Sequence, residues 1–363
     1  MPDSITVLTW SPELGKRRRT GDWQEQTVST VQKIEEAIRQ SSPEVAAELI
    51  DYFMEEAKIC HKIYVGWAQA FEEWLLREGT SSADVIGEKA RLSSLLRFPD
   101  GERFEPEARW GQLGAHAGRL ANQLRAEVIE PKEAIEEMEN LREAWRQLHD
   151  RWVDYAGGFL TFVAKRFGEA AIERCYRHIM EPLVQERYMP YDTRLQPYED
   201  TIERNLYYSL EAMRAHLSGP GRRGDLELEE HNDRWEIRFD PCGSGGAQTR
   251  GDASEGTPPR PEPPYNFGVT EREHNWAWNK RGICYYCAHC CFALELLPIE
   301  RWGTPVRVVD PPQYSREDTS VTPRKCQWTI YKSVDAIPPF VYERVGLSPP
   351  LNRNSDSAKD ARA

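Results

Sequence analysis

Most cysteines of this chain gather in one region, where their spacing is suited to holding a metal ion. Six of the eight lie in that region: Cys242, Cys284, Cys287, Cys290, Cys291 and Cys326. Thiolates at positions i and i+3 can reach one ion from a loop or a first helical turn, so Cys284 and Cys287 predict a metal site. The further ligands of a tetrahedral zinc would come from other parts of the fold: Cys242, His289, Asp310 or Cys326.

The same cysteines also allow an iron–sulfur cluster. Cys284, Cys287 and Cys290 form a Cys-x-x-Cys-x-x-Cys run, and Cys326 could supply the fourth ligand. The bacterial ferredoxin run continues with a fourth cysteine followed by proline, which is missing here. Cys291 stands beside Phe292 in an apolar run, and we expect it to be a buried small side chain.

A second candidate is the glycine-rich segment 240–246, Asp-Pro-Cys-Gly-Ser-Gly-Gly, directly after an expected strand. Its backbone N–H groups can converge on an anion, so a Cys242 thiolate would lie among oxyanion donors and could act as a nucleophile, assisted by Ser244. A glycine-rich turn that carries a metal ligand or a buried cysteine is the alternative. The segment is not a Walker A loop, because no Gly-Lys-Ser/Thr follows.

The histidines nearest the cysteines are candidate ligands or bases. His289 lies within the cysteine run and His274 just before it. Cys242 and His289 are therefore the predicted catalytic residues. For His61 and His149, which lies beside Asp150, we expect ordinary hydrogen bonds between helices. Aromatic residues around the cysteines could wall a small-molecule pocket or form the core of a small domain: Trp276, Trp278, Tyr285, Tyr286, Trp302 and Trp328.

Helices and strands must position these groups. Apolar residues at helical spacing, with proline, glycine and serine at the ends, predict helices over 27–79, 111–128, 131–168, 169–187 and 199–217. Loop signals fill 79–108. Alternation from 226 to 239 predicts a β-hairpin, followed by a proline-rich connector at 258–264. A short helix is expected at 284–297, with strands at 305–309 and 327–332.

Residues 61–74 and 149–162 form a degenerate internal repeat, in which His61 aligns with His149 and Phe71 with Phe159. Two similar long helices can pack face to face, so the repeat favours a helical bundle. We therefore predict an α+β protein, a helical-bundle N-terminal domain with a smaller Cys-rich α/β domain. The expected divisions are a disordered 1–25, a helical domain at 26–220, the Cys-rich domain at 224–346 and a disordered tail at 347–363.

Composition narrows the classes of protein. The net charge is 47 − 59 = −12, which argues against a nucleic-acid-binding surface over the whole molecule. No apolar run approaches the roughly 20 residues that span a bilayer, and the N-terminus lacks a signal pattern. Clustered cysteines favour a reducing compartment, so we expect a cytoplasmic location. The basic runs 16–19 and 222–223 are expected to be solvated loops.

Residues 282–332 have a familiar order: a Cys-rich short helix, Glu295, then Gly-Thr-Pro-Val-Arg-Val at 303–308 and Cys-Gln-Trp-Thr-Ile at 326–330. This order resembles the vinyl-reductase-like (4VR) small-molecule-binding domain and the L-2-amino-thiazoline-4-carboxylic acid hydrolase-like proteins. The first resemblance implies a zinc held by Cys and Glu, falling here on Cys284 or Cys287 and on Cys326. The second implies ring opening or C–N hydrolysis of a small cyclic substrate. The chain departs from the pattern in having Cys326 alone where late cysteines are paired.

These observations lead to one function and two alternatives. We expect a zinc-binding, cysteine-rich cytoplasmic hydrolase that cleaves a C–N or C–S bond of a small molecule, with Cys284, Cys287, Cys290 and Cys326 as metal ligands. A zinc-stapled sensor module without catalysis is the first alternative, and an iron–sulfur redox protein is the second. The expected partner is a small-molecule substrate or ligand, with no nucleic acid or membrane, and the helical domain could form a homo-oligomer.

Overall fold

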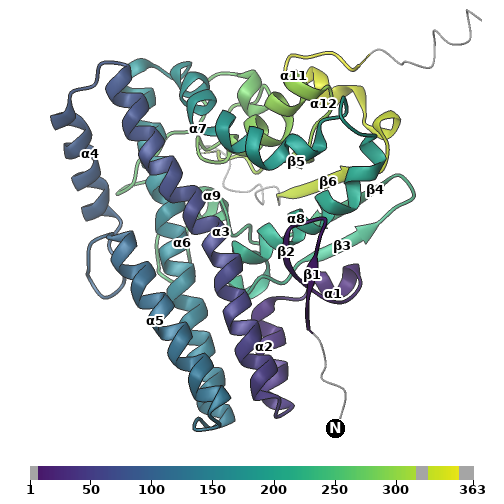
Figure 1. Ribbon diagram of the computed structural model, residues 1–363. Coiled ribbons are helices and arrows are strands. Elements are labelled where there is room, and N and C mark those ends of the chain that lie inside the picture. Colours follow the sequence, from purple (N-terminus) through teal and green to yellow (C-terminus); the bar gives the residue numbers. More distant parts are fainter. Residues whose placement is uncertain (1–6, 316–325, 351–363) are drawn as a thin grey trace, which may run out of the picture.

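The protein is seen here as a computed structural model that describes residues 7–315 and 326–350 (Figure 1). It is a mixed α+β structure with small antiparallel sheets. Long helices fill one side of the molecule, and shorter helices, loops and the larger sheet fill the other. Within the described residues no helix combines the length and apolar character needed to cross a membrane.

The sequence forms its longest helices where proline opens them and glycine or a polar residue ends them. Pro43, Pro106 and Pro131 each occupy the first turn, where a missing N–H costs no hydrogen bond. Gly168 ends the longest helix with a φ of 84°, which favours glycine. The helices of this part are α1 (Trp23–Thr27), α2 (Thr30–Arg39), α3 (Pro43–Arg77), α4 (Ser82–Leu95), α5 (Pro106–Arg125), α6 (Pro131–Phe167), α7 (Ala171–Tyr188) and α8 (Ile202–Ala215).

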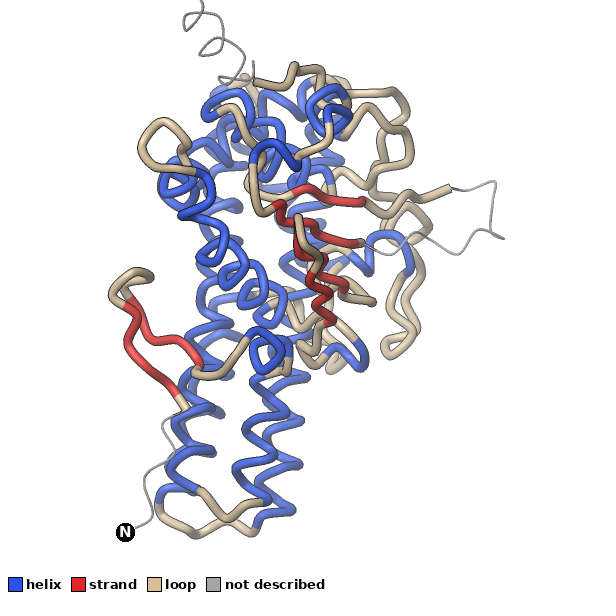
Figure 2. The backbone as a smooth tube through the Cα atoms, turned by 90° about the vertical axis from the view of Figure 1, so that its right-hand side faces the viewer, coloured by secondary structure: helices blue, strands red, loops and turns tan. Residues whose placement is uncertain are grey.

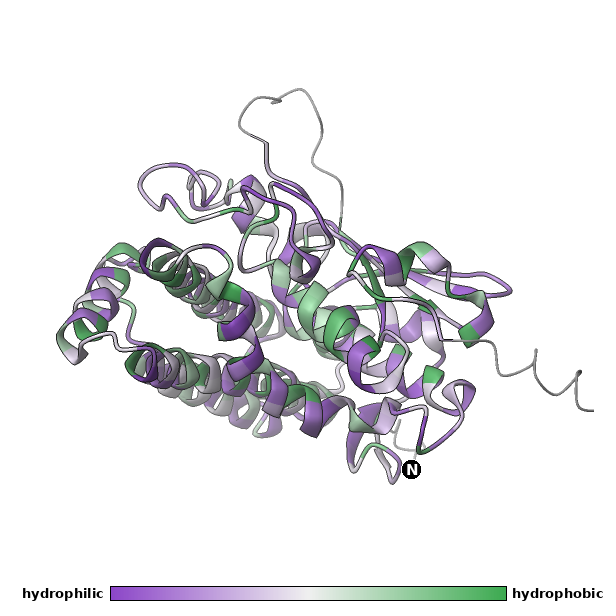
Figure 3. Cartoon of the chain, turned by 90° about the horizontal axis from the view of Figure 1, so that it is seen from above, coloured by the Kyte–Doolittle hydropathy of each residue, from purple (hydrophilic) through white to green (hydrophobic). Residues whose placement is uncertain are grey.

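Helices α3 and α6, which carry the two copies of the repeat, pack against each other. The rings of Phe71 and Phe159, equivalent positions in the repeat, stack with centroids 5.5 Å apart. Seen from above, polar residues lie on the outer faces of the long helices (Figure 3). The prediction that the two similar helices meet face to face is therefore confirmed at this pair of residues.

A four-stranded antiparallel sheet has the order β3-β4-β6-β5. Its strands are β3 (Glu227–Glu230), β4 (Arg234–Arg238), β5 (Val308–Asp310) and β6 (Gln327–Tyr331). Ile237 faces Leu228 on one side and Trp328 on the other, so the alternating apolar residues of the predicted hairpin share one face. The hairpin and the two later strands occur where the sequence predicted them.

Short elements connect the helices with the sheet. Before the sheet come the 3-10 turns η1 (Met189–Tyr191), η2 (Tyr198–Thr201) and η3 (Pro220–Arg222). After β4 come α9 (Gly246–Arg250), η4 (Asn275–Ala277), α10 (Ala288–Cys291), the π-helical η5 (Phe292–Leu296), α11 (Leu297–Trp302), η6 (Val334–Ala336) and α12 (Pro339–Glu343). The helix expected at 284–297 is therefore observed over 288–302, where a π-helical turn separates two short α-helices.

Two segments differ from the sequence-based predictions. Helix α4 lies where only loops were expected, because Ser81 caps its N-terminus and Leu92 packs against Gly158. The N-terminal segment, expected to be disordered, forms a hairpin of β1 (Leu8–Ser11) and β2 (Lys16–Arg19), which lies apart from the larger sheet (Figure 2). Of the predicted tail at 347–363, residues 351–363 lie outside the described part of the chain.

The basic runs were expected to be solvated loops, and this prediction is wrong for two of their residues. Arg19 is buried and donates hydrogen bonds to the carbonyl oxygens of Val28 and Glu25. Arg222 forms an ion pair with the buried carboxylate of Asp150. Both segments fold inward because the chain supplies acceptors for each guanidinium group in the interior.

Candidate active site

Four cysteine thiols converge on one small void. Cys242, Cys287, Cys290 and Cys326 line it together with His289 and Trp328. Cys242 follows β4, Cys326 precedes β6, and the other two flank the start of α10. The sheet and the short helix therefore bring together cysteines that are far apart in the sequence.

Two pairs of neighbouring thiols lie in and beside this void, Cys242 with Cys326 and Cys287 with Cys284. Four thiolates around one zinc lie about 3.8 Å apart, because each Zn–S bond is about 2.3 Å long. Among the described residues, no three cysteine sulfurs lie within 4.8 Å of one another. A single zinc would therefore draw the pairs together, whereas a polynuclear cluster could bridge them at a larger separation.

The glycine-rich loop holds the Cys242 sulfur among hydrogen-bond donors. Gly245 N–H lies 3.5 Å from the Cys242 sulfur. The hydrogen bond from the Cys326 thiol, together with the N–H groups of Gly245 and Ser244, lowers the pKa of Cys242 to about 6, despite burial. The predicted convergence of backbone donors on this thiol is therefore present, and these donors favour its thiolate form.

Two glycines of this loop allow close approaches that a larger residue would block. A Cβ on Gly243 would lie 1.9 Å from the carbonyl oxygen of His216, and one on Gly245 would lie 2.7 Å from the Cys287 sulfur. The loop therefore packs directly on the end of α8 and on the cysteine run. This contact fixes the position of Cys242 relative to both.

His289 faces the void as a neutral base. Its Nδ1 lies 2.6 Å from the carbonyl oxygen of Tyr286, so Nδ1 carries the proton and Nε2 is left as an acceptor. Nε2 lies 3.4 Å from the Cys290 sulfur. Burial lowers the pKa of His289 to about 4. The predicted catalytic histidine is thus next to a thiol of the cluster, in the form that accepts a proton.

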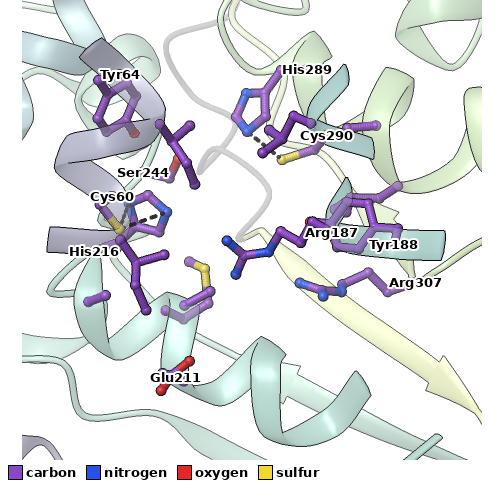
Figure 4. A pocket seen from close by; sticks show the side chains of 18 of the residues that line it. Cys60, Tyr64, Arg187, Tyr188, Glu211, His216, Ser244, His289, Cys290 and Arg307 are labelled. Atoms are coloured by element: carbon purple, nitrogen blue, oxygen red, sulfur yellow. Dashed lines mark hydrogen bonds between the residues drawn. The ribbon is translucent and has the colours of Figure 1, made fainter. Parts of the chain in front are cut away.

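A larger cavity, of about 90 Å³, adjoins the void (Figure 4). Helices α3, α7 and α8 form one part of its wall, and the cysteine region forms the other. The two spaces share five lining residues: Ser244, Tyr286, His289, Cys290 and Trp328. A molecule in the cavity would therefore lie beside the thiol cluster.

A buried relay of hydrogen bonds ends at this cavity. His149 Nδ1 lies 2.9 Å from Asp150 Oδ1, and His149 Nε2 lies 2.6 Å from His216 Nδ1. Since Asp150 is an acceptor, His149 donates from Nδ1, accepts at Nε2 and leaves His216 protonated at Nδ1. The Nε2 of His216, a cavity-lining residue, is then an acceptor, and the Cys60 sulfur lies 3.8 Å from it.

The electrostatics of the relay agree with these roles. Burial would raise the pKa of Asp150, but Arg222 and His149 hold it well below its ordinary range. Burial, and secondarily the neighbouring His149, holds the pKa of His216 well below 6.5. Asp150 is therefore a carboxylate and His216 a neutral imidazole. The hydrogen bonds expected for His149 are present, and they connect a carboxylate to the cavity.

Several sequence candidates lie outside the two spaces. Cys284 pairs with Cys287 but does not line the void. Cys291 is fully buried, as expected, and contacts Trp278 N–H and the Asn275 carbonyl oxygen. His274 bonds to Glu169 over 2.8 Å. Neither Asp310 nor His274 lines the void or the cavity.

Glu295 is occupied by protein partners. Its carboxylate accepts hydrogen bonds from Arg344, from the Trp278 indole at 2.9 Å and from Val309 N–H at 2.8 Å. These contacts give the carboxylate a structural role. The 4VR resemblance implied a cysteine–glutamate zinc, and this glutamate has little capacity left for a metal.

Sequence analysis did not identify the cavity residues contributed by the long helices. Cys60, Arg187 and His216 come from α3, from α7 and from the end of α8. His216 lies 3.8 Å from the Cys60 sulfur. None of these residues stands in a motif, and only their meeting in space marks them.

One other group in the described part of the chain has metal-ligand chemistry, Glu229, His231 and Glu236 on the hairpin. Both glutamates already pair with Arg238, at 2.8 Å and 2.7 Å.

Comparison with known proteins identifies no relative, because no family model, no curated protein and no solved structure matches the chain.

Proposed function

We propose that this protein is a cytoplasmic enzyme in which a thiolate-bound metal centre acts on a small molecule, by hydrolysis of a C–N or C–S bond. One observation carries the proposal: the four-thiol void shares a wall with a cavity that also contains neutral histidines. A structural zinc site would need the thiols but not the adjoining cavity.

We propose that the chain forms the two domains expected from its sequence. A helical-bundle domain supplies α3, α6, α7 and α8, and a smaller Cys-rich α/β domain supplies the thiols. The cavity would then lie where the two domains meet, a common place for a ligand site.

Zinc is the metal we propose, with Cys242, Cys287 and Cys326 as its ligands and the fourth position open toward Cys290 and the cavity. Support comes from the lowered pKa of Cys242 and the burial of all three cysteines. Zinc bound here would supply a Lewis acid that polarises a carbonyl or lowers the pKa of water.

The chain's own residues would handle the proton and the developing charge. His216 Nε2 accepts the proton of the attacking water, and Asp150 and His149 hold it in the accepting tautomer. Tyr286 and Ser244, whose hydroxyl groups lie 2.8 Å apart, line the cavity and can donate to a developing oxyanion.

An iron–sulfur redox protein is the second candidate. The observation that favours it is the separation of the thiols into two pairs rather than one close tetrahedron. Four cysteine thiolates can hold an iron–sulfur cluster, and the void offers four cysteines.

Elemental analysis of anaerobically purified protein tests the metal centre. We expect about one zinc per chain, lost in Cys242→Ser and Cys287→Ser and kept in Cys291→Ser, a neighbouring buried cysteine outside the void. Several irons with inorganic sulfide would establish the second candidate instead. Protein without either metal would contradict both.

Turnover tests the catalytic assignment once a hydrolysed substrate is found in a screen of cyclic amides and thioesters. His216→Gln should lower kcat by about 10²- to 10⁴-fold, while its zinc content stays that of the wild type. A ligand that raises Tm but is always recovered unchanged would indicate a binding module without catalysis.

A further inference from the structure

Most buried arginines of this protein face a carboxylate. Arg214 pairs with Glu56 at 3.0 Å, and Arg260 pairs with Asp154 at 2.8 Å. Arg146 pairs with several acids, among them Asp150 at 3.1 Å. Because a guanidinium group stays charged in proteins, its burial is tolerated where an anion compensates it.

Arg307 and Arg187, which line the cavity, depart from this pattern. Arg307 is only 3% exposed, and within the described residues its Nε and Nη2 have no hydrogen-bond partner. The Nε of Arg187 likewise has none. Arg307 packs on the Trp328 ring, 4.7 Å from its centroid, which holds the side chain in place but does not neutralise it.

The cavity wall carries an excess of positive charge. Its charged residues are Arg187, Arg307 and Glu211, and burial keeps His216 and His289 neutral. The carboxylate of Glu211 already pairs with Lys16 and accepts a hydrogen bond from Tyr52. In Figure 4 both guanidinium groups point toward the space that His216 bounds from the other side.

We propose that Arg187 and Arg307 bind the oxyanion group, a carboxylate or a phosphate, of a small organic molecule. One negative charge on the bound molecule balances the net positive charge of the cavity wall. Planar guanidinium groups present paired hydrogen-bond donors to such oxygens. The apolar body of the molecule lies against Ile63 and Trp67 of α3.

The anion is also placed beside the thiol cluster. Arg307 and Cys290 line the same cavity, and Cys290 also lines the void. An anionic group held by Arg307 leaves the neighbouring atoms of the molecule near His289 and Cys290. The identification of this molecule as a substrate rests on the proposed function, whereas its binding does not.

Binding of benzoate, phenyl phosphate and benzamide, measured by calorimetry in low-chloride buffer, tests the proposal. We expect benzoate to bind and the neutral, nearly isosteric benzamide to bind at least about tenfold more weakly. Arg187→Met and Arg307→Met should each raise the Kd of benzoate about tenfold or more. Arg194→Met, at an exposed arginine outside the cavity, should leave it unchanged. The relative affinities of benzoate and phenyl phosphate identify which oxyanion the site prefers.

Arg307→Lys guards against misfolding of the methionine variant, because it keeps the charge and loses the planar fork. It should bind benzoate with an intermediate Kd. Equal binding of benzoate and benzamide, wild-type Kd values in both methionine variants, or no binding of either anion to the wild type would overturn the proposal.

Metal analysis of the same samples separates this proposal from the proposed function. If protein that holds no metal binds benzoate, the anion site is supported and the proposed metalloenzyme is contradicted. If zinc-loaded protein binds neither anion, the anion site is contradicted and the proposed metal centre is kept.

Discussion

The buried charges of this protein are arranged in two different ways. Along α6 and the segment that follows α9, Arg146, Arg151, Asp150 and Glu255 form an interior network in which each charge meets an opposite one. In the cavity, Arg307 has no carboxylate partner among the described residues. The difference shows that the fold can pair an interior arginine, so an unpaired one marks a place that another molecule completes.

Breaking a complete pair should have the largest effect on stability. Arg214→Met leaves Glu56, which is 2% exposed, as an uncompensated buried carboxylate. We expect the free energy of unfolding to fall by about 3–5 kcal/mol, measured by urea denaturation. Arg214→Lys keeps the charge and should lose less. If the free energy of unfolding falls by less than about 1 kcal/mol, burial of the Glu56 carboxylate does not depend on Arg214.

Acidification tests the groups that the interior keeps neutral. Burial lowers the pKa of His61 to about 4, below its unfolded value near 6.5. The unfolded state therefore binds a proton first as the pH falls, and this contribution, complete above pH 6.5, is lost between about pH 6.5 and 4. The expected loss is up to about 1.4 kcal/mol per pH unit for each such histidine.

The control for this prediction is His61→Gln, which keeps an acceptor for the Trp152 indole, 3.2 Å from His61 Nδ1. The variant should show a shallower fall of the unfolding free energy over the same pH range. Identical slopes for the variant and the wild type would mean that His61 has the same pKa in the folded and unfolded states.

Removing an unpaired charge should change the free energy of unfolding less than breaking the Arg214–Glu56 pair does, and in the opposite direction. Arg307→Met fills similar volume without a charge, so the free energy of unfolding should stay the same or rise by about 1 kcal/mol. Urea denaturation beside Arg214→Met measures the contrast directly. A loss comparable with that of Arg214→Met would show that Arg307 has a partner in the folded protein, and the comparison would fail.

A pair whose arginine is exposed, while its glutamate also pairs with Arg223, sets the lower limit of the comparison. Arg39 and Glu35, one turn apart on α2, lie 3.0 Å from each other, and the Arg39 side chain is 56% exposed. Arg39→Ala should change the free energy of unfolding by no more than about 0.5 kcal/mol. Raising the salt concentration should abolish even this difference, which a buried pair would largely retain.

The sequence predicted elements whose signals are local. Pro43 and Pro131 open the long helices, and Gly168 ends one of them, as their conformational limits require. The alternation of Trp235, Ile237 and Phe239 likewise identified the hairpin. Helix α4 was missed because few of its residues are buried and its pattern is weak.

The candidate site could be predicted only in part. Cys242, Cys287 and His289 were found from the sequence, because their residue types are rare and their spacing is chemically specific. Arg187 and His216 were not found, because an arginine or histidine on an amphipathic helix is usually a surface residue. Their meeting in one cavity follows from the way α7 and α8 pack, and one sequence carries no local signal for that packing.

The order in which the chain is synthesised has a consequence for the thiol cluster. Cys242, Cys287 and Cys290 leave the ribosome before Cys326, whose strand β6 lies between β4 and β5 in the finished sheet. Until β6 inserts, Cys242 lacks the thiol that donates a hydrogen bond to it. The nascent chain therefore exposes three of the four thiols of the void to oxidants before the sheet closes, and the proposed metal would bind only after that closure.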